Sequence, residues 1–302
     1  MSATFLKWAG GKAKLAPRVV QRLPAAFGRY HEPFLGGGAV YFALCAAGRA
    51  GSARLADSNA DLVECFGMVR DRTEDLIEVL LGVEAEYLAL DPDGRRACYL
   101  AHRAAIPRDP VERAARLIFL NHTCYNGLYR VNAKGQFNVP HGRYVKPRIA
   151  DVPGLRAAAA CLDHAELACE DFEAACAHAR RGDLVYLDPP YYPLSATSHF
   201  TAYTANAFGP GEHERLRDCF EALTRRGVAA ILSNSEHPAV RELYEGRGYC
   251  LDVVEMSRAI NSVGSGRSRI PELLIDNFER PEVLPALAGA QGHLRLETAG
   301  QR

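Results

Sequence analysis

The chain has 302 residues, of which 48% are hydrophobic and 24% charged, and its formal net charge is zero. These values are typical of a globular protein with one large or two ordinary domains. Because it has no run of 18 or more apolar residues and no signal-peptide pattern, the sequence predicts a cytoplasmic protein without a membrane span. The nine cysteines show no CxxC pair or zinc-finger spacing, so we expect reduced thiols and no metal site.

The first sixty residues have the pattern of a βαβ unit. Apolar residues at helical spacing predict a helix from Leu15 to Leu23, which Pro24 ends. A short strand, Tyr30–Phe34, precedes three glycines and an apolar helix, Ala39–Ala47, and a second strand, Arg54–Asp57, ends in an acid. This order predicts a mostly parallel sheet.

The middle of the chain differs from both ends. Residues from about Asp61 to Leu120 have a helical pattern, and Asn121–Lys146 predicts a hairpin with Lys134-Gly135 at its turn. Strand and helix patterns then alternate again to Phe278. The further strands that we expect are Glu166–Glu170, Leu184–Leu187, Val228–Leu232, Cys250–Glu255 and Leu273–Ile275. The sequence therefore predicts one α/β domain with a mainly helical insert.

Charge is unevenly distributed in that insert. Residues 101–150 contain nine Lys or Arg against two acids, a net charge of +7, interleaved with tyrosine and phenylalanine. A basic stripe with aromatic rings is typical of a surface that binds a phosphate backbone, although a solvated charged face gives the same pattern.

The most informative motif is Asp188-Pro189-Pro190-Tyr191, which follows the apolar strand Leu184–Leu187. The prolines remove two amide donors, so the Pro189 carbonyl can point outward. An amino group on a flat ring can then donate to Asp188 and to this carbonyl while the ring stacks on Tyr191. A strand-to-loop exit with Tyr191 in the core is the competing interpretation.

Residues suited to a nucleoside cofactor follow the other strands. The segment Pro33–Gly38 allows close approach of the backbone to a ligand at the carboxyl edge of the sheet, but it does not match G-x-G-x-x-G. Asp57 is placed to accept from a ribose diol, or else to cap the next helix. Asp171 can hold an adenine while Phe172 stacks on it. Alternatively, Asp171 is a helix cap and Phe172 a ring in the core. The loop Phe5–Lys12 lacks the Walker spacing.

Taken in order, these segments resemble the Dam-type DNA adenine methyltransferases of the D12 class (alpha group). The matches cover nearly the whole chain from Phe5 to about Ile275. They are Phe5–Lys12, Glu32-Pro33-Phe34, Leu55–Asp57, Asn121 with Cys124–Leu128, Phe137–Pro140, Gly142–Tyr144, Asp188–Tyr191, and Leu194–Thr197 with Phe200–Tyr203.

The resemblance implies an S-adenosylmethionine-dependent methyltransferase fold, an α/β sheet of seven strands with the last antiparallel. It also implies a division of the chain. We expect a catalytic domain at 1–60 and 148–278, a target-recognition insert at 61–147 and a flexible tail at 279–302. The expected activity is N6-methylation of a flipped-out adenine in duplex DNA at the nucleoid, without a metal; oligomeric state stays open, with a monomer on DNA as one arrangement.

The resemblance also assigns roles to residues. Trp8, Lys12, Asp57 and Asp188 match positions that line the S-adenosylmethionine pocket, with Phe34 and Gly36 close by. Asp188 and Tyr191 match the residues that hold the flipped adenine. Extrusion of a base costs about a few kcal/mol, of which stacking on Tyr191 recovers roughly 1–3 kcal/mol. Asp188 and the Pro189 carbonyl are expected to favour the positive charge that develops on N6.

Other matched positions suggest GATC as the target. Arg130 matches a position that recognises guanine, although a plain phosphate contact is the alternative. Lys7 matches a contact to the first guanine. The remaining expected DNA contacts are Leu128 and Pro140 at a thymine methyl, Tyr125 as an inserted ring with Asn126 beside it, and Arg143 and Tyr144 at the backbone.

The chain departs from the family pattern in three places. His122 stands where arginine is usual, Tyr129 is larger than its counterpart, and Ala39 replaces a serine. The alternatives are N4-cytosine or RNA methylation, a DNA-binding module without catalysis, and a Rossmann oxidoreductase. Asp at the start of the 188–191 motif favours adenine over cytosine, and a basic aromatic insert has no purpose in an oxidoreductase. The loop Arg258–Arg269 is a further candidate phosphate contact.

Overall fold

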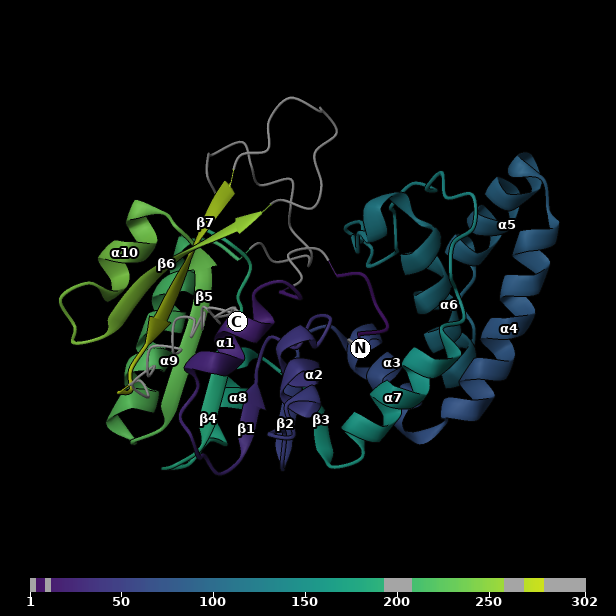
Figure 1. Cartoon of the computed structure of the whole chain (residues 1–302). Helices are drawn as coiled ribbons and strands as arrows, with labels where there is room; N and C mark the ends of the chain where they lie inside the picture. Colours follow the sequence, from purple (N-terminus) through teal and green to yellow (C-terminus); the bar gives the residue numbers. More distant parts are fainter. Residues whose placement is uncertain (1–3, 9–11, 193–207, 258–268, 280–302) are drawn as a thin grey trace, which may run out of the picture.

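The computed structural model describes residues 4–8, 12–192, 208–257 and 269–279. Its centre is one seven-stranded sheet in the order β3-β2-β1-β4-β5-β7-β6 (Figure 1). All seven predicted strands are present. Their bounds are β1 Tyr30–Glu32, β2 Ala53–Asp57, β3 Ala165–Cys169, β4 Leu184–Leu187, β5 Ala229–Ser235, β6 Cys250–Ser257 and β7 Arg269–Asp276.

The direction of β7 determines which of its residues reach the site. Strands β1 to β5 pair in parallel, whereas β7 lies between β5 and β6 and is antiparallel to both. In register, Ser235 at the end of β5 faces Glu272 near the start of β7. The beginning of β7 therefore lies at the carboxyl edge of the parallel strands, the edge where α/β proteins bind ligands.

Alternating side chains of the strands point to two hydrophobic layers. Tyr186 and Ile231 pack with the first layer, and Val185 and Leu232 pack with the second. The first layer is formed with α1 (Ala16–Arg22), α2 (Ala39–Ala46), α3 (Ala60–Asp71) and α7 (Val152–Leu162). The second is formed with α8 (Phe172–Ala177), α9 (Pro210–Arg225) and α10 (Pro238–Tyr244). The sheet is thus covered on both faces, as its apolar strands require.

A helical segment separates the neighbouring strands β2 and β3. After α3 it continues with α4 (Thr73–Ala89), α5 (Pro92–Ala104) and α6 (Pro110–Thr123), which lie beyond the β3 end of the sheet in Figure 1. Asp91 and Asp109 cap α5 and α6, and each precedes a proline in the first turn. This is a helix start that the sequence specifies locally, because the cap accepts amide donors and proline lacks one.

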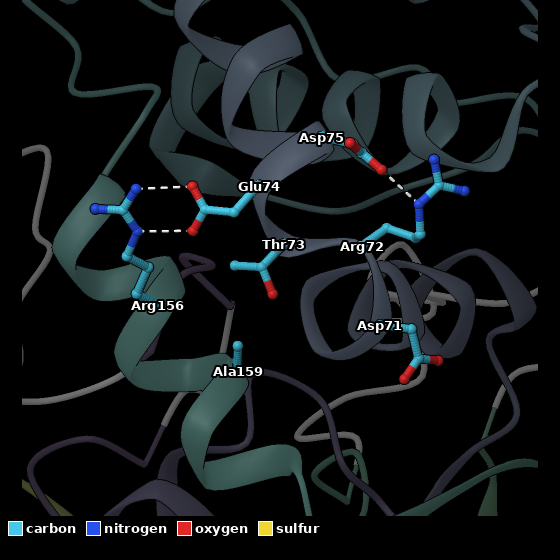
Figure 2. A pocket seen from close by; sticks show the side chains of 7 residues that line it. All are labelled: Asp71, Arg72, Thr73, Glu74, Asp75, Arg156 and Ala159. Carbon is cyan, nitrogen blue, oxygen red and sulfur yellow. Dashed lines mark hydrogen bonds and ion pairs between the residues drawn. The ribbon is translucent and has the colours of Figure 1, made fainter.

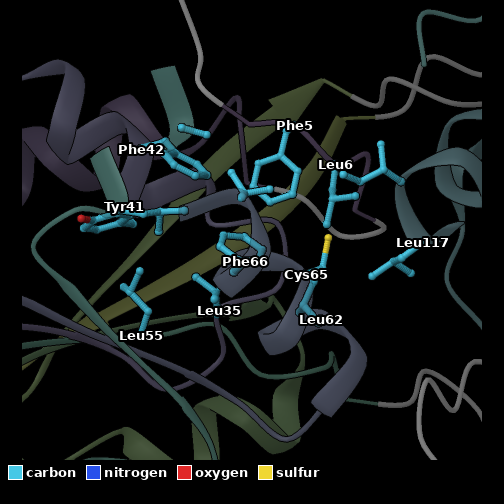
Figure 3. Close-up of a cluster of buried hydrophobic side chains, with 14 of the residues drawn as sticks. Phe5, Leu6, Leu35, Tyr41, Phe42, Leu55, Leu62, Cys65, Phe66 and Leu117 are labelled. Carbon is cyan, nitrogen blue, oxygen red and sulfur yellow. The ribbon is translucent and has the colours of Figure 1, made fainter. Parts of the chain in front are cut away.

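The N-terminal segment joins this helical segment to the sheet. Phe5 packs against Phe66 of α3, with ring centroids 4.8 Å apart, and against Phe42 of α2 at 6.3 Å. Leu6 and Leu117 of α6 belong to the same buried cluster (Figure 3). The hydrophobic core is therefore continuous from the sheet into the helical insert.

The predicted hairpin is present as a narrow loop with little regular pairing. Two isolated antiparallel bridges join Cys124 to His141 and Val131 to Phe137. The turn closes where Gly135, with φ of 74°, donates its amide to the Asn132 carbonyl over 2.9 Å. Glycine suits this position because side chains disfavour positive φ.

Some expectations fall outside the described residues. These are the segments Leu194–Thr197 and Phe200–Tyr203, the loop Arg258–Arg269 apart from its last residue, and the tail beyond Glu279. Within the described ranges no helix has the length and apolarity to cross a membrane. All nine cysteines are free thiols.

Candidate active site

Asp188 lies at the carboxyl edge of the sheet, directly after β4, and its two oxygens have different surroundings. Oδ1 lies 3.0 Å from Lys12 Nζ and accepts from Ser233 Oγ, also over 3.0 Å. Among the described residues Oδ2 has no hydrogen-bond partner, and the same holds for the Pro189 carbonyl. The Asp188 side chain is 21% exposed, so a ligand can reach it. The edge thus offers two adjacent acceptors.

Lys12 sets the charge of this edge. It is buried, donates to the Tyr191 hydroxyl over 2.8 Å and lies 3.8 Å from Glu272 Oε1. Burial lowers the pKa of Lys12, but the charges of Asp188, Tyr191 and Glu272 outweigh it and leave the pKa above its usual range. Burial raises the pKa of Asp188, an effect opposed by Lys12 and Ser233. Lys12 is therefore a cation that favours ionised Asp188.

Tyr191 presents a partly exposed ring whose hydroxyl is held from two sides. The hydroxyl accepts from Lys12 and donates to Glu272 Oε1. Lys12 Nζ also lies 4.4 Å from the centroid of the ring, and the residue is 37% exposed. The competing interpretation of Tyr191 as a core ring is thus wrong, because more than a third of its surface is open to solvent.

The glycine loop between β1 and α2 packs directly on Trp8. A Cβ on Gly36, whose φ is 48°, would lie 2.9 Å from Trp8 Cδ1, and one on Gly37 would lie 2.9 Å from Trp8 Cβ. Asp57 holds the same loop, since its Oδ2 accepts from the Gly36 amide over 3.0 Å. Asp57 does not cap α3; Asn59 does. The glycines therefore allow backbone, indole and carboxylate to approach one another.

Phe34, Phe172 and Phe208 form an aromatic cluster beside this loop. Phe34 and Phe172 stack with centroids 5.3 Å apart, and Phe172 is buried. Asp171 caps α8 and accepts from Arg215 Nη2 over 2.9 Å. The structure therefore shows the cap and core ring that were the alternative to adenine binding, and adenine binding by Asp171 and Phe172 stays a prediction.

Glu32, at the end of β1, is a buried carboxyl beneath the site. It accepts from the Tyr30 hydroxyl over 2.7 Å. Burial, partly opposed by this hydrogen bond, raises the pKa of Glu32 to about 8, and the charge of Asp188 acts in the same direction as burial. At neutral pH Glu32 is therefore mostly protonated and adds little charge beneath Asp188.

The structure brings two of the predicted DNA contacts, Lys7 and Tyr144, together beside the hairpin. Asn121 accepts from the Lys7 amide over 2.8 Å and donates to the Lys7 and Gly127 carbonyls. Lys7 Nζ lies 4.3 Å from the centroid of the Tyr144 ring. Gly127, with φ of 61°, packs so closely on Lys7 that a Cβ would lie 2.5 Å from Lys7 Cβ. The buried Asn121 thus fixes Lys7 against the hairpin.

The hairpin presents its predicted contacts at its surface. Tyr125 is 48% exposed, and its amide donates to the Pro140 carbonyl over 2.9 Å. Asn126 has a φ of 55° and is the only described non-glycine residue with a positive φ. Leu128 is half-buried, and Arg143 is exposed. Tyr125 and Pro140 are therefore neighbours although fifteen positions separate them.

Arg130 is held by one residue of the opposite hairpin segment. Its Nε donates to Asn138 Oδ1 over 2.6 Å and its Nη2 to the Asn138 carbonyl over 3.1 Å. Nε and Nη2 are thus both held by hydrogen bonds within the protein. No contact is seen for Nη1 within the described residues. The guanidinium is therefore oriented before any ligand binds.

Part of the basic stripe has a structural role. Arg113 forms an ion pair with Glu64 over 2.6 Å, and Arg116 donates to the His102 and Arg103 carbonyls at the end of α5. The expectation that the whole stripe marks a phosphate-binding surface is therefore corrected for α6. In α6, Arg113 pairs with an acid, and Arg116 donates to the carbonyls at the end of α5. Cations commonly bond carbonyls at helix C-termini in this way.

Two departures from the family pattern make internal contacts. His122 lies between two backbone carbonyls, with Nε2 2.9 Å from the Phe5 oxygen and Nδ1 at the Arg148 oxygen. Tyr129 stacks on Trp8 at 5.4 Å, and its hydroxyl donates to Asp61 over 3.3 Å. Both side chains therefore support the N-terminal segment that contains Lys7 and Trp8.

Two surface hollows are seen among the described residues, and neither is lined by Lys12, Asp188 or Tyr191. One, of about 460 Å³, is lined by charged residues of α3, α4 and α7, in which Glu74 accepts from Arg156 and Asp75 from Arg72 (Figure 2). It lies near the start of β3, the opposite edge of the sheet, because the adjacent Arg70 binds the Ala165 carbonyl. The other, of about 450 Å³, lies between α9 and α10 beside Tyr192. In the described part of the chain no cluster of His, Cys, Asp and Glu is arranged for a metal ion.

Comparison with known proteins agrees with this geometry. A family model described as D12 class N6 adenine-specific DNA methyltransferase matches residues 8–260. The chain belongs to this family. It is 39% identical to the type II methyltransferase M1.LlaDCHI of Lactococcus lactis subsp. cremoris over 284 residues, which cover 91% of this chain and 95% of that protein.

Two further relatives span a similar share. Identity is 40% over 286 residues with the type II methyltransferase M.MjaIII of Methanocaldococcus jannaschii, covering 91% of this chain and 98% of the relative. Identity is 35% over 274 residues with the DNA adenine methylase of Escherichia coli K12, which covers 89% of this chain and 93% of that relative. The chain is therefore an adenine-specific DNA methyltransferase, and its family implies a methyl donor.

Two residues of this methyltransferase site are absent from the sequence-based expectations. Ser233 and Glu272 both contact the Asp188, Lys12 and Tyr191 group. Ser233 follows an apolar strand, Val228–Leu232, as Asp57 and Asp188 follow theirs, so the same signal identifies it. Glu272 lies near the start of a strand, and it reaches the site only because β7 is antiparallel.

Proposed function

We propose that this methyltransferase transfers the methyl group of S-adenosylmethionine to N6 of an adenine that has been turned out of duplex DNA, within GATC. The observation that supports this most directly is that Asp188 Oδ2 and the Pro189 carbonyl have no partner among the described residues and lie beside the partly exposed Tyr191. An adenine amino group has two protons for two such acceptors. The adenine ring can stack on the adjacent ring of Tyr191.

Asp188 and Pro189 act on the reacting amine. The N6 lone pair is delocalised into the ring, and hydrogen bonds from both N6 protons favour its localisation and the positive charge that develops there. Lys12 and Ser233, on the far oxygen of Asp188, keep the carboxylate ionised and fix its direction. In-line approach of donor and acceptor is then the remaining requirement for transfer, and N6 releases one of its two protons once it is methylated.

The residues present fit S-adenosylmethionine. When bound, this donor supplies an electrophilic methyl group on a sulfonium centre. Asp57 keeps lone pairs to accept from a ribose diol, while the backbone of Gly36 is open to close approach. At the carboxyl edge of the sheet, two carboxyl groups lie near a single lysine, and this excess of acid suits a cationic ligand; the residues are Asp188, Glu272 and Lys12. We therefore assign donor binding to Trp8, Lys12, Phe34, Gly36, Asp57, Asp171, Phe172 and Asp188.

We assign target recognition to the insert 61–147 together with Lys7, and catalysis to 1–60 and 148–278. Lys7 lies against the hairpin, and Arg130 is oriented by Asn138, so both cations are directed before DNA binds. A guanidinium fork suits O6 and N7 of guanine. Tyr125 and Pro140 are adjacent, which supports a ring inserted into the duplex beside an apolar thymine contact. Because its substrate is DNA, we expect the enzyme at the nucleoid.

Methyl transfer from labelled S-adenosylmethionine to two duplexes tests this proposal. One duplex contains a single GATC, and the other has GTTC in its place. We expect label on the first alone, recovered as N6-methyladenine, and none with Asp188→Ala. Label on both duplexes would support the methyltransferase activity but exclude the GATC assignment. Unchanged transfer by Asp188→Ala would exclude the mechanism.

A further inference from the structure

Glu272 is a buried carboxyl that the chain brings to the site from its last strand. It lies near the start of β7, opposite Ser235 of β5, and is 9% exposed. Its Oε1 accepts from the Tyr191 hydroxyl and lies 3.8 Å from Lys12 Nζ. A strand remote in sequence from the 188–191 motif thus contacts the residue at the end of that motif.

Burial of the second carboxyl oxygen of Glu272 costs folding free energy. Oε2 is buried and has no hydrogen-bond partner in the part of the chain that the structure describes, although a buried carboxylate is stable only when its oxygens are satisfied. Lys12 is shared between Glu272 and the closer Asp188 at 3.0 Å, so it compensates Glu272 only in part. An apolar side chain of similar size would avoid this cost. The fold alone therefore gives no reason for a glutamate here.

The contact with Tyr191 gives such a reason. Tyr191 is 37% exposed as a residue, and its ring can turn about the side-chain torsions unless its far end is held. Lys12 donates to the hydroxyl and Glu272 accepts from it, so the hydroxyl proton has one direction and the plane of the ring is fixed. A fixed ring gives a base one stacked position, with its amino group at Asp188 and Pro189.

We propose that Glu272 is a positioning residue for methyl transfer, which acts through the Tyr191 hydroxyl to hold the ring on which the target adenine stacks. This inference depends on the proposed role of Tyr191. Glu272 itself does not contact the reacting atoms. Its effect is on the orientation of the bound base and hence on the rate of transfer once DNA is bound.

A double-mutant cycle tests the inference with three variants: Glu272→Leu, Tyr191→Phe and the two combined. Because each single change removes the same charge-assisted hydrogen bond, we expect each to lower kcat by about tenfold. The combined variant should lose no more than Tyr191→Phe alone, since both changes break the Tyr191–Glu272 hydrogen bond and Tyr191→Phe removes the Lys12 contact as well. KM for DNA should be nearly unchanged in all three variants.

Two further variants separate positioning from folding. Glu272→Gln retains an acceptor for the Tyr191 hydroxyl and should recover most of the kcat that Glu272→Leu loses. The thermal midpoint of Glu272→Leu should equal or exceed that of the wild type, because an unsatisfied buried carboxyl is gone. Glu245→Gln, at the end of α10 and the opposite edge of the sheet, is the control and should leave kcat unchanged.

Several results would overturn the inference. They are a wild-type kcat for Glu272→Leu or for Tyr191→Phe, multiplicative losses in the combined variant, and a loss in Glu272→Leu that Glu272→Gln does not recover. If Glu272→Leu does not fold, a wild-type kcat for Tyr191→Phe still overturns the inference. A wild-type enzyme that leaves adenine unmodified would instead contradict the proposed function, so the two failures are distinct.

Discussion

Lys12 Nζ donates to the Tyr191 hydroxyl over 2.8 Å across 179 positions of sequence, and the same atom lies 3.0 Å from Asp188 Oδ1. One buried cation therefore connects the stacking ring and the carboxylate of the proposed site. Substitutions of these three side chains should not have additive effects, because they share one interaction network.

Replacement of Lys12 by methionine should reduce both stability and activity. Because the change leaves Asp188 and Glu272 without their buried counter-charge, we expect the free energy of unfolding to fall by about 3 kcal/mol. Activity should fall at least a hundredfold, since the pKa of Asp188 rises further and the Tyr191 hydroxyl loses its donor. Urea unfolding and single-turnover methyl transfer measure the two effects.

The double variant Lys12→Met/Asp188→Asn separates these effects. Asparagine removes the uncompensated charge, so stability should recover in part while activity stays lost. Recovery of activity in the double variant would show that transfer does not need an ionised carboxylate at position 188.

Replacement of Ser233 by alanine should shift the pH dependence of methyl transfer. Burial raises the pKa of Asp188, and the hydrogen bond from Ser233 lowers it. Because transfer needs ionised Asp188, kcat increases as pH rises through that pKa. Without Ser233 the pKa is higher, so the acidic limb of the kcat profile should move to higher pH.

Two comparisons check this interpretation. Tyr186→Phe removes a hydroxyl 2.9 Å from Ser233 Oγ and should shift the limb in the same direction by less. Ser235→Ala, whose hydroxyl bonds only Asn234 among the described residues, should not shift it. An acidic limb that stays in place in Ser233→Ala would mean that another group than Asp188 controls it.

The Arg130–Asn138 contact predicts a change in sequence discrimination. Arg130→Ala should reduce the preference for guanine in the target by about 1–3 kcal/mol, or roughly ten- to a hundredfold in kcat/KM between duplexes. Asn138→Ala leaves the guanidinium but removes two acceptors that orient it, so it should have a smaller effect of the same kind.

The exposed Arg143 is the matched control for this experiment. Its replacement by alanine should weaken binding equally on all duplexes and lower the slope of binding with salt by about one unit. If Arg130→Ala behaves in the same way, Arg130 is a phosphate contact and the GATC assignment loses its main support.

The glycine loop predicts a difference between two glycine-to-alanine changes. Gly36 and Gly48 both have positive φ, 48° and 66°, but only at Gly36 would a Cβ meet another residue, Trp8 at 2.9 Å. Gly48→Ala should therefore cost about 1 kcal/mol of stability from backbone strain alone. Gly36→Ala should cost more and also weaken S-adenosylmethionine binding.

Thermal unfolding and calorimetric titration of the donor measure these two quantities. Replacement of Trp8 by leucine in the Gly36→Ala background should restore part of the lost stability, because it removes the clash. Equal donor affinity in Gly36→Ala and Gly48→Ala would show that the loop does not contact the donor.

Strand positions could be predicted from local sequence, because apolar runs such as Leu184–Leu187 end in turn residues or acids. The expected strand Leu273–Ile275 is five residues shorter than β7, and β5 continues to Ser235 instead of ending at Leu232. The last three residues of β5, Ser233 to Ser235, are polar yet buried, and Ser233 contacts Asp188 at the edge of the sheet. Local hydrophobicity does not distinguish such buried polar residues from exposed ones.

The site could be predicted in part for a related reason. Residues that follow parallel strands, such as Asp57 and Asp188, share one edge whatever the strand order. Glu272 does not follow this rule, since only its pairing with β5 determines that it reaches the same edge. In the basic stripe, Arg113 and Arg130 look alike in sequence, and only their partners Glu64 and Asn138 distinguish a packing role from a surface one.

The insertion of β7 between β5 and β6 affects the order in which a growing polypeptide can mature. On the ribosome, β5 and β6 emerge before the strand that pairs with both of them. Until β7 follows, β5 has an open edge and β6 has no neighbour, a state prone to association with other chains. A product terminated before residue 272 lacks that strand and the carboxyl that contacts Tyr191. The residue that is proposed to hold Tyr191 is thus among the last parts of the site to be synthesised.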